Sequence, residues 1–180
     1  IKSIRSRFSA SELTLRVDAN GAFSPAEAPF KLEKLAAYDL HSIEQPIKAG
    51  QPEEMRKLVA QQILPIALDE ELIGVFRMEE KVRLLQKISP QFVILKPSLV
   101  GGFRGTKEWI DTAEQLQMKW WITSALESNI GLNAIAQWTF LQNNPMPQGL
   151  GTGGLYTNNF DCPLEVQKGR LFYNNQLAWN

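Results

Sequence analysis

The stretch LPIALD (64–69) is a short apolar run that ends in an acidic residue, and the same arrangement recurs on both sides of it. Three other runs end in the same way, with a charged residue after apolar ones: LTLRVD (13–18), HSIE (41–44) and FVILK (92–96). The steps between their last residues are 26, 25 and 27 positions. A step of this size holds one strand, one helix and two loops. The spacing therefore predicts a series of βα units.

The charged residues at the ends of these runs are expected to meet. Parallel strands wound in right-handed units bring their carboxyl ends to one rim of a sheet or barrel. Asp18, Glu44 and Asp69 would then lie close together and repel one another unless a cation lay between them. The spacing thus predicts a divalent metal site, with Lys96 beside it.

Composition and charge narrow the possible partners. The chain has 180 residues, of which 44% are apolar and 21% charged, and its 19 basic residues balance 19 acidic ones. This balance, with no basic stripe, argues against nucleic acid or an anionic membrane as a partner. A single cysteine, Cys162, and a single histidine, His41, exclude an internal disulfide framework and a multi-histidine zinc site within one chain. We find no signal peptide and no bilayer-spanning apolar run, so a cytoplasmic location is expected. The oligomeric state is left open.

Strand and helix patterns alternate along the chain. The expected strands cover 13–17, 42–44, 65–68, 92–95, 119–123 and 148–150, and the expected helices 25–38, 52–62, 75–88, 107–117 and 129–141. Ser24 and Glu27 form the pattern of a capping box at the first helix. The segment LEVQKGRLFY (164–173) predicts two strands joined at Lys168-Gly169.

This alternation predicts an α/β fold. We expect an incomplete (β/α)8-type barrel with about six of its eight strands. A doubly wound sheet would suit the chain length better. The barrel is preferred because every strand carries a polar residue at its tip, whereas a doubly wound sheet concentrates its site at one switch point.

Six short motifs carry a resemblance to a known family. They are VDAN (17–20), IEQP (43–46), ALDE (67–70), ILKPS (94–98), TSALES (123–128) and GLGTGG (149–154). In this order they resemble the enolase superfamily in its muconate-lactonizing subgroup, and within it the o-succinylbenzoate synthases most. The resemblance covers nearly the whole chain.

The resemblance implies a role for several residues. It makes Asp18, Glu44 and Asp69 the ligands of Mg²⁺, with Mn²⁺ as a possible substitute. It makes Lys96 the catalytic lysine of the sixth barrel strand, which stabilises an intermediate as a cation. It also places both Ser124 and Gly149 near a substrate carboxylate.

Two further substrate-binding candidates come from strand alternation. Arg16 precedes Asp18 by two residues and therefore points to the same inner face, where it would hold an anionic substrate or pair with a buried carboxylate. Asn20 would follow on that face if the strand continued so far. Glu70 is expected either to support Asp69 or to lie on the surface.

The implied reaction is a dehydration that depends on Mg²⁺. The resemblance implies conversion of 2-succinyl-6-hydroxy-2,4-cyclohexadiene-1-carboxylate to o-succinylbenzoate through a metal-stabilised enediolate, in menaquinone biosynthesis. The alternatives are a dipeptide epimerase, a muconate cycloisomerase, or a non-catalytic barrel fragment with no activity. The segment 149–154 lacks the acidic D-x-D motif that dipeptide epimerases usually carry there, which argues against that activity.

The resemblance also implies that parts of the enzyme are missing. We expect residues 1–180 to be the C-terminal part of the catalytic barrel, with 161–180 as a tail that in the family packs back on the capping domain. The first two strands, the capping domain and the second catalytic lysine would precede Ile1. The fragment alone is therefore expected to be inactive. Of the remaining residues, His41, Trp120 and Trp121 are expected to be structural.

Overall fold

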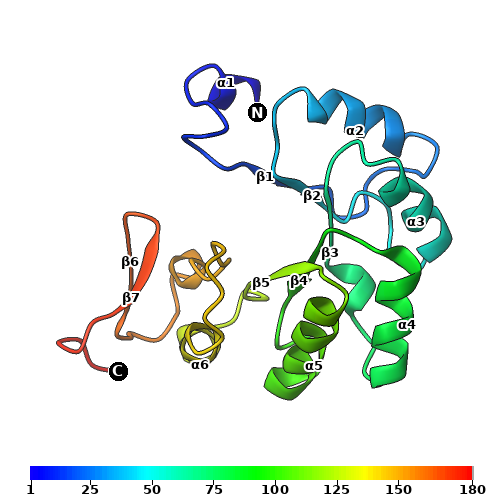
Figure 1. Ribbon diagram of the computed structural model, residues 1–180. Coiled ribbons are helices and arrows are strands. Elements are labelled where there is room, and N and C mark those ends of the chain that lie inside the picture. The colour runs from blue at the N-terminus through cyan, green and yellow to red at the C-terminus, as the bar shows by residue number, and fades with distance from the viewer. Residues whose placement is uncertain (180) are drawn as a thin grey trace.

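Five parallel strands form one sheet in the order in which they occur in the sequence (Figure 1). The structure is a computed structural model that describes residues 1–179. The strands are β1 (Arg16–Asp18), β2 (Ser42–Glu44), β3 (Ile66–Leu68), β4 (Phe92–Leu95) and β5 (Lys119–Ile122). Each pairs in parallel with the next, which is the order that a series of βα units produces.

Helices connect successive strands and lie along one side of the row of strands (Figure 1). They are α2 (Ala28–Ala36), α3 (Pro52–Ala60), α4 (Met78–Ile88) and α5 (Gly102–Gln115), and α6 (Asn129–Phe140) follows β5. Shorter elements are α1 (Lys2–Arg5) and two 3₁₀ turns, η1 (Glu70–Leu72) and η2 (Gly153–Leu155). The predicted α/β fold class is confirmed.

The central strands β3 and β4 are buried on both faces, as is usual in a parallel sheet, while the edge strand β1 is only partly buried. Along β4, Val93 and Leu95 belong to the large core beneath the helices. The alternate residues Phe92 and Ile94 form a second cluster with Trp121 on the other face. Because side chains alternate along a strand, one short apolar run supplies both layers.

The prediction of a sixth strand at residues 148–150 is wrong. Residues 148–150 contribute a single parallel bridge, between Thr123 and Gly149. The Gly149 N–H donates to the Ile122 carbonyl at 2.8 Å, and the Ser124 N–H donates to the Gly149 carbonyl at 3.1 Å. The segment thus continues the order of the sheet by one residue. Within residues 1–179 the row of strands is an open arc and not a closed barrel.

The tail forms the predicted hairpin. Strands β6 (Leu164–Gln167) and β7 (Arg170–Tyr173) pair antiparallel. Lys168 and Gly169 join them with φ values of 50° and 74°, the positive pair that a tight hairpin turn needs. Packing of the tail on a capping domain stays a prediction, and Asn180, its last residue, lies outside the described residues.

Three helix starts differ from the prediction: those of α2 and α5, and that of α4, which begins at Met78 and not at residue 75. The capping box is present, since the Ser24 hydroxyl donates to Glu27 at 2.6 Å, but residues 24–27 form a turn and α2 begins at Ala28. Helix α5 begins at Gly102, five residues before the predicted start. Its glycine-rich first turn resembles a loop, yet Gly105 is required there because a side chain would overlap the Val100 carbonyl.

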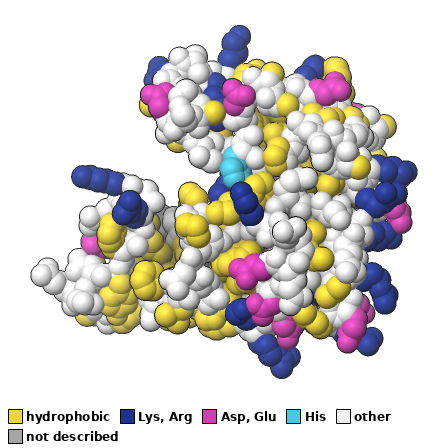
Figure 2. Space-filling model, viewed as in Figure 1, with side chains coloured by type: hydrophobic (Ala, Val, Ile, Leu, Met, Phe, Trp, Pro, Cys, Tyr) yellow, Lys and Arg dark blue, Asp and Glu magenta, His cyan; other side chains and the backbone are white. Residues whose placement is uncertain are grey.

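Charge is distributed unevenly over the surface. In the view of Figure 2, basic and acidic side chains intermingle over the helices on the right, while apolar side chains gather towards the C-terminal elements on the left. Large exposed apolar side chains of that region include Phe140, Leu141 and Val166. Among residues 1–179, no helix combines the length and apolar character needed to cross a membrane.

Candidate functional site

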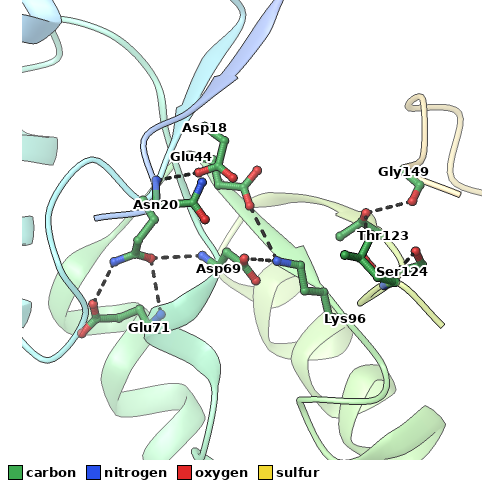
Figure 3. A network of polar contacts seen from close by, with 11 residues as sticks. Asp18, Asn20, Glu44, Asp69, Glu71, Lys96, Thr123, Ser124 and Gly149 are labelled. Carbon is green, nitrogen blue, oxygen red and sulfur yellow. Dashed lines mark hydrogen bonds and ion pairs between the residues drawn. The ribbon is translucent and has the colours of Figure 1, made fainter. Parts of the chain in front are cut away.

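The carboxyl ends of β1, β2 and β3 bring three acidic residues to one rim (Figure 3). Asp18 and Glu44 are direct partners in the parallel register of β1 and β2. Glu44 lies opposite Ala67 on β3, and Asp69 follows the end of that strand. As predicted from the sequence, the steps of 26 and 25 residues bring the ends of the three strands to the same level of the sheet, so their acidic residues meet.

Lys96 follows β4 and reaches back to these carboxylates. Its ammonium donates a hydrogen bond to Asp69 Oδ2, and its Nζ lies 3.9 Å from Glu44 Oε1. The Asp69 side chain is only 3% exposed, whereas those of Lys96 and Glu44 are 22% and 20% exposed. The four predicted residues thus form one cluster in which Asp69 is buried, Glu44 and Lys96 are partly buried and Asp18 is exposed.

The cluster is short of positive charge. Burial and the neighbouring charges of Asp18 and Asp69 raise the pKa of Glu44 to about 8, although Lys96 opposes the shift. The pKa of Glu70 is also raised, first by burial and then by the charges of Asp69 and Asp18. Glu70 Oε2 is buried without a hydrogen-bond partner. One ammonium does not compensate four carboxyl groups, so a further cation would stabilise the ionised forms.

The donor set fits a hard divalent cation. Carboxylate oxygens are the ligands that Mg²⁺ prefers, and a site of this kind keeps positions for substrate and water. Among the described residues, no three acidic, histidine or cysteine side chains already stand in the arrangement of ligands around one ion. The assignment of Asp18, Glu44 and Asp69 as metal ligands therefore rests on donor chemistry and uncompensated charge, and it stays a prediction.

Burial and the neighbouring carboxylates act on the pKa of Lys96 in opposite directions. A partly desolvated lysine is expected to have a lowered pKa and could then act as a base. Burial does act in that direction here, but the hydrogen bond to Asp69 and the charges of Asp69 and Glu44 outweigh it and raise the pKa of Lys96. The direction of this shift favours the charged ammonium, and the catalytic role of Lys96 stays a prediction.

Arg16 and Asn20 take different positions from those expected of a pair on one face. The Arg16 guanidinium lies 4.0 Å from the ring centroid of Trp121 and donates to the Pro147 carbonyl at 3.1 Å. It therefore crosses the inner face from β1 to the segment after α6. Strand β1 ends at Asp18, and Asn20 lies in a turn with φ of 47°, where its backbone N–H donates to Asp18 Oδ1 at 2.8 Å.

Ser124 and Gly149 lie beside each other at the end of β5. The Ser124 side chain is buried, and its hydroxyl forms a hydrogen bond with that of Thr152. Thr123 Oγ1 donates to the Gly149 carbonyl at 2.8 Å. A side chain at position 149 would overlap Thr123, which explains the glycine. These hydroxyls form a small polar group, as Figure 3 shows.

The residues expected to be structural are so. Trp120 belongs to the core beneath the helices and Trp121 to the inner cluster, so the two rings face opposite sides of β5. The His41 ring lies 4.6 Å from that of Phe92, and its Nδ1 forms a hydrogen bond with the Ser42 hydroxyl.

Sequence reasoning missed three polar residues beside the site. Gln45 and Glu71 are buried and hydrogen bond to each other, and Thr152 pairs with Ser124. Gln45 follows Glu44 within IEQP, so its adjacency to a proposed ligand was the available signal. Glu71 carries no such signal, because nothing in DEE (69–71) shows which carboxylates turn inwards.

The chain matches the family model described as "Enolase C-terminal domain-like" over residues 1–175. It is 56% identical over 171 residues to the o-succinylbenzoate synthase of Desulfotalea psychrophila, which covers 95% of this chain and 46% of that protein. Against the o-succinylbenzoate synthase of Vibrio cholerae it is 32% identical, over 84% of this chain and 46% of that protein.

A solved structure gives the same relationship. The crystal structure of MenC from Desulfotalea psychrophila matches with a TM-score of 0.91 and 56% identity, over 94% of this chain and 48% of that one. The chain thus spans about half the length of the relatives it matches. With a family model that matches nearly every residue, the chain belongs to the enolase C-terminal domain-like family.

Proposed function

We propose that this chain carries the metal-binding half of the active site of an o-succinylbenzoate synthase. The reaction would be the Mg²⁺-dependent dehydration of 2-succinyl-6-hydroxy-2,4-cyclohexadiene-1-carboxylate to o-succinylbenzoate in menaquinone biosynthesis. The observation that carries the proposal is the cluster of Asp18, Glu44, Asp69 and Lys96 on one rim. The 56% identity to the relative from Desulfotalea psychrophila supports the choice of reaction.

Asp18, Glu44 and Asp69 would hold the ion, each from a different strand end. When bound, Mg²⁺ would draw electron density from the substrate carboxylate and so make the neighbouring C–H bond more acidic. Asn20 would keep the Asp18 carboxylate in place through the hydrogen bond from its backbone N–H. This contact gives Asp18 a backbone support, which favours a preorganised site.

Lys96 would stabilise negative charge that develops on the substrate. Its ammonium is directed at Asp69 and Glu44, so the side chain would act through its positive charge. An ammonium held over a ring also attracts the π electrons. Both interactions strengthen as charge develops, which is the condition for lowering a barrier.

The polar group around Ser124 would bind the succinyl carboxylate. The hydroxyls of Ser124 and Thr152 supply donors there, and Gly149 lets its segment lie directly against Thr123 beside them. Arg16 is already engaged with Pro147 and Trp121. We therefore assign it to holding the segment that carries Gly149, and through it the carboxylate pocket.

The proposed dehydration needs one more group, which transfers protons. A proton leaves the carbon next to the carboxylate, hydroxide leaves the adjacent carbon, and the two together make water. Lys96 holds charge in this scheme, so the proton transfers fall to the second lysine that the resemblance implies. The relatives are about twice the length of this chain, and the proposal places that lysine in their N-terminal half.

A chimera tests this proposal. We would join the N-terminal half of the Desulfotalea psychrophila relative to this chain and measure dehydration of the substrate with Mg²⁺. We expect turnover from the chimera and none from this chain alone. Lys96→Ala in the chimera should lower kcat by about 10²–10³-fold, as loss of a charge-stabilising group does. A folded chimera that turns over the substrate equally well with alanine at position 96 would refute the role of Lys96.

The same chimera distinguishes the proposed function from the alternative functions. Epimerisation of a dipeptide or cycloisomerisation of muconate, without dehydration, would assign the chain to another activity of the superfamily. A folded chimera without any of these activities and without Mg²⁺ binding would favour a non-catalytic fragment. The cytoplasmic location and the small carboxylate substrate remain predictions that follow from the proposed reaction.

A further inference from the structure

Gln45 is a buried polar residue between two of the proposed metal ligands. It follows Glu44 directly, is fully buried, and lies across the rim from Asp69. Its side-chain oxygen accepts hydrogen bonds from the N–H groups of Asp69 at 3.2 Å and Glu71 at 3.3 Å. Its side-chain nitrogen donates to the Ile47 carbonyl at 3.0 Å and to Glu71 Oε2 at 3.2 Å. All of its hydrogen-bonding capacity faces these neighbours.

The orientation of this amide follows from its partners. Two backbone N–H groups point at one end of the Gln45 side chain, and an N–H group can only donate, so that end is the oxygen. A carbonyl and a carboxylate oxygen face the other end, which must therefore be the NH₂ group. The reversed orientation would set donors against donors and acceptors against acceptors.

The consequence is that two nearby carboxylates turn in opposite directions. Asp69 turns towards Lys96, while Glu71 is held on the other side by Gln45 and by the Gly50 N–H, which donates to Glu71 Oε1 at 3.1 Å. Figure 3 shows Lys96 and Glu71 on opposite sides of Asp69. Without these restraints, the peptide that joins β3 to η1 could rotate and bring Glu71 towards the cluster.

The backbone of Gln45 shows that the position is constrained. Its φ is 36°, a left-handed value that is unfavourable for a residue with a side chain and unusual before a proline such as Pro46. Its N–H donates to the Ala67 carbonyl at 2.9 Å, and its carbonyl accepts from the Gly21 N–H at 2.7 Å. Backbone and side chain together join the ends of β1, β2 and β3.

We propose that Gln45 is a positioning residue of the site, which fixes Asp69 and keeps Glu71 out. Through the Asp69 N–H it sets where that carboxylate stands relative to Lys96 and Glu44. Through Glu71 Oε2 it prevents a fourth carboxylate from joining the proposed ligands. Gln45 would act through Asp69 and Glu71, because the hydrogen bonds of its side chain all go to protein groups, and the part of this inference that concerns Mg²⁺ rests on the proposed function.

Gln91 supplies a matched control at the other end of β3. Its side-chain oxygen accepts the Ile66 N–H at 2.9 Å, so it makes the same kind of bond to the same strand. It lies before β4, at the end of the sheet away from Asp69. Loss of a glutamine that merely supports the strand should therefore have similar effects at both positions, whereas loss of a positioning residue should not.

The experiment compares Gln45→Met with Gln91→Met in the whole chain. We expect Q45M to weaken Mg²⁺ binding about tenfold or more by calorimetry, as removal of groups that orient ligands does. Q91M should leave the Mg²⁺ dissociation constant within about twofold of the parent, whatever its effect on the melting temperature. Equal Mg²⁺ affinity in Q45M and the parent, or equal loss in both variants, would overturn the proposal.

A metal-free measurement makes the inference independent of the metal. By NMR, Q45M should accelerate hydrogen exchange at the Asp69 and Glu71 amides about tenfold or more relative to the Ile66 amide. Q91M should instead accelerate exchange at the Ile66 amide relative to those of Asp69 and Glu71. If the parent binds no Mg²⁺, the proposed function fails while this measurement still decides the role of Gln45. If Q45M does not fold, the unmodified chain gives the answer: the Gln45 side-chain NH₂ must exchange more slowly than that of exposed Gln137, and equal rates would refute the inference.

Discussion

Gly149 lies where the segment after α6 approaches β5 most closely. Replacement by alanine would set a methyl group against the Thr123 side chain, so we expect Gly149→Ala to destabilise the fold by about 1–3 kcal/mol. Gly151 is the matched control, because a methyl group there meets no atom within 4 Å. Thermal unfolding of both variants measures the difference. Similar melting temperatures for G149A and G151A would show that Thr123 does not constrain position 149.

At the scale of single residues, the charged residues at the strand ends could be predicted from the sequence, but the residues and contacts that hold them in place could not. Asp18, Glu44, Asp69 and Lys96 were predictable because each ends an apolar run, and runs of even spacing end at one level. The raised pKa of Lys96 was not predictable, because it depends on how closely Asp69 approaches it in three dimensions. The same holds for Gln45, whose partners Asp69 and Glu71 lie 24 and 26 positions away in the sequence.

At the scale of elements, α4 and α5 are joined by an ion pair away from the site. Lys81 on α4 has a fully buried side chain, and its ammonium donates to Glu108 on α5 at 2.8 Å and to the Gly105 carbonyl at 3.0 Å. The hydrogen bond from Lys81 lowers the pKa of Glu108 below its usual value of 4.5. The pair therefore links stability to pH.

The sign of this link is fixed by the direction of the shift. A carboxyl group whose pKa is lower in the folded than in the unfolded protein stabilises the fold fully above the unfolded value, and this contribution is lost as pH falls through the folded value. Below about pH 4.5 we expect the free energy of unfolding to fall less steeply in Glu108→Gln than in the parent.

The matched control for this prediction is Glu79→Gln. Glu79 lies on α4, is 74% exposed and reaches Arg77 only at 4.0 Å. Denaturant unfolding between pH 3 and 6, in ~0.5-unit steps, measures the free energy of unfolding of the parent, E108Q and E79Q. Parallel profiles for the parent and E108Q would show that the Lys81–Glu108 pair does not contribute to the acid sensitivity.

Element boundaries were predictable only in part, for two different reasons. Helix α5 begins at Gly102 because Gly105 allows close packing against Val100, which a glycine-rich sequence does not reveal. Residues 148–150 have the apolar and polar pattern of a strand end, but only Gly149 forms a backbone bridge, with Thr123, while Gln148 bonds to β5 through its side chain. Pairing depends on the neighbouring strand, so pattern alone overestimates the length of an edge strand.

At the scale of the whole molecule, the five strands form an arc whose two ends are joined by a side chain. Arg16 on β1 reaches the Pro147 carbonyl and lies over Trp121 on β5. Partial burial lowers the pKa of Arg16, against the charge of Glu44. Arg16 thus spans the inner face from β1 to the segment that carries Gly149, and the acidic cluster and Ser124 both lie at the carboxyl ends of the strands (Figure 3).

The central claim is that the rim of β1, β2 and β3 binds one divalent cation through Asp18, Glu44 and Asp69. Isothermal titration calorimetry of the 180-residue chain with Mg²⁺ tests it most directly. Asp69→Asn keeps the size of the side chain and removes its charge, and Glu79→Gln removes a charge away from the rim. We predict one Mg²⁺ per chain for the parent and for E79Q, and no measurable binding for D69N. A parent chain that binds no Mg²⁺, or a folded D69N variant that binds it as tightly as the parent, would contradict the claim.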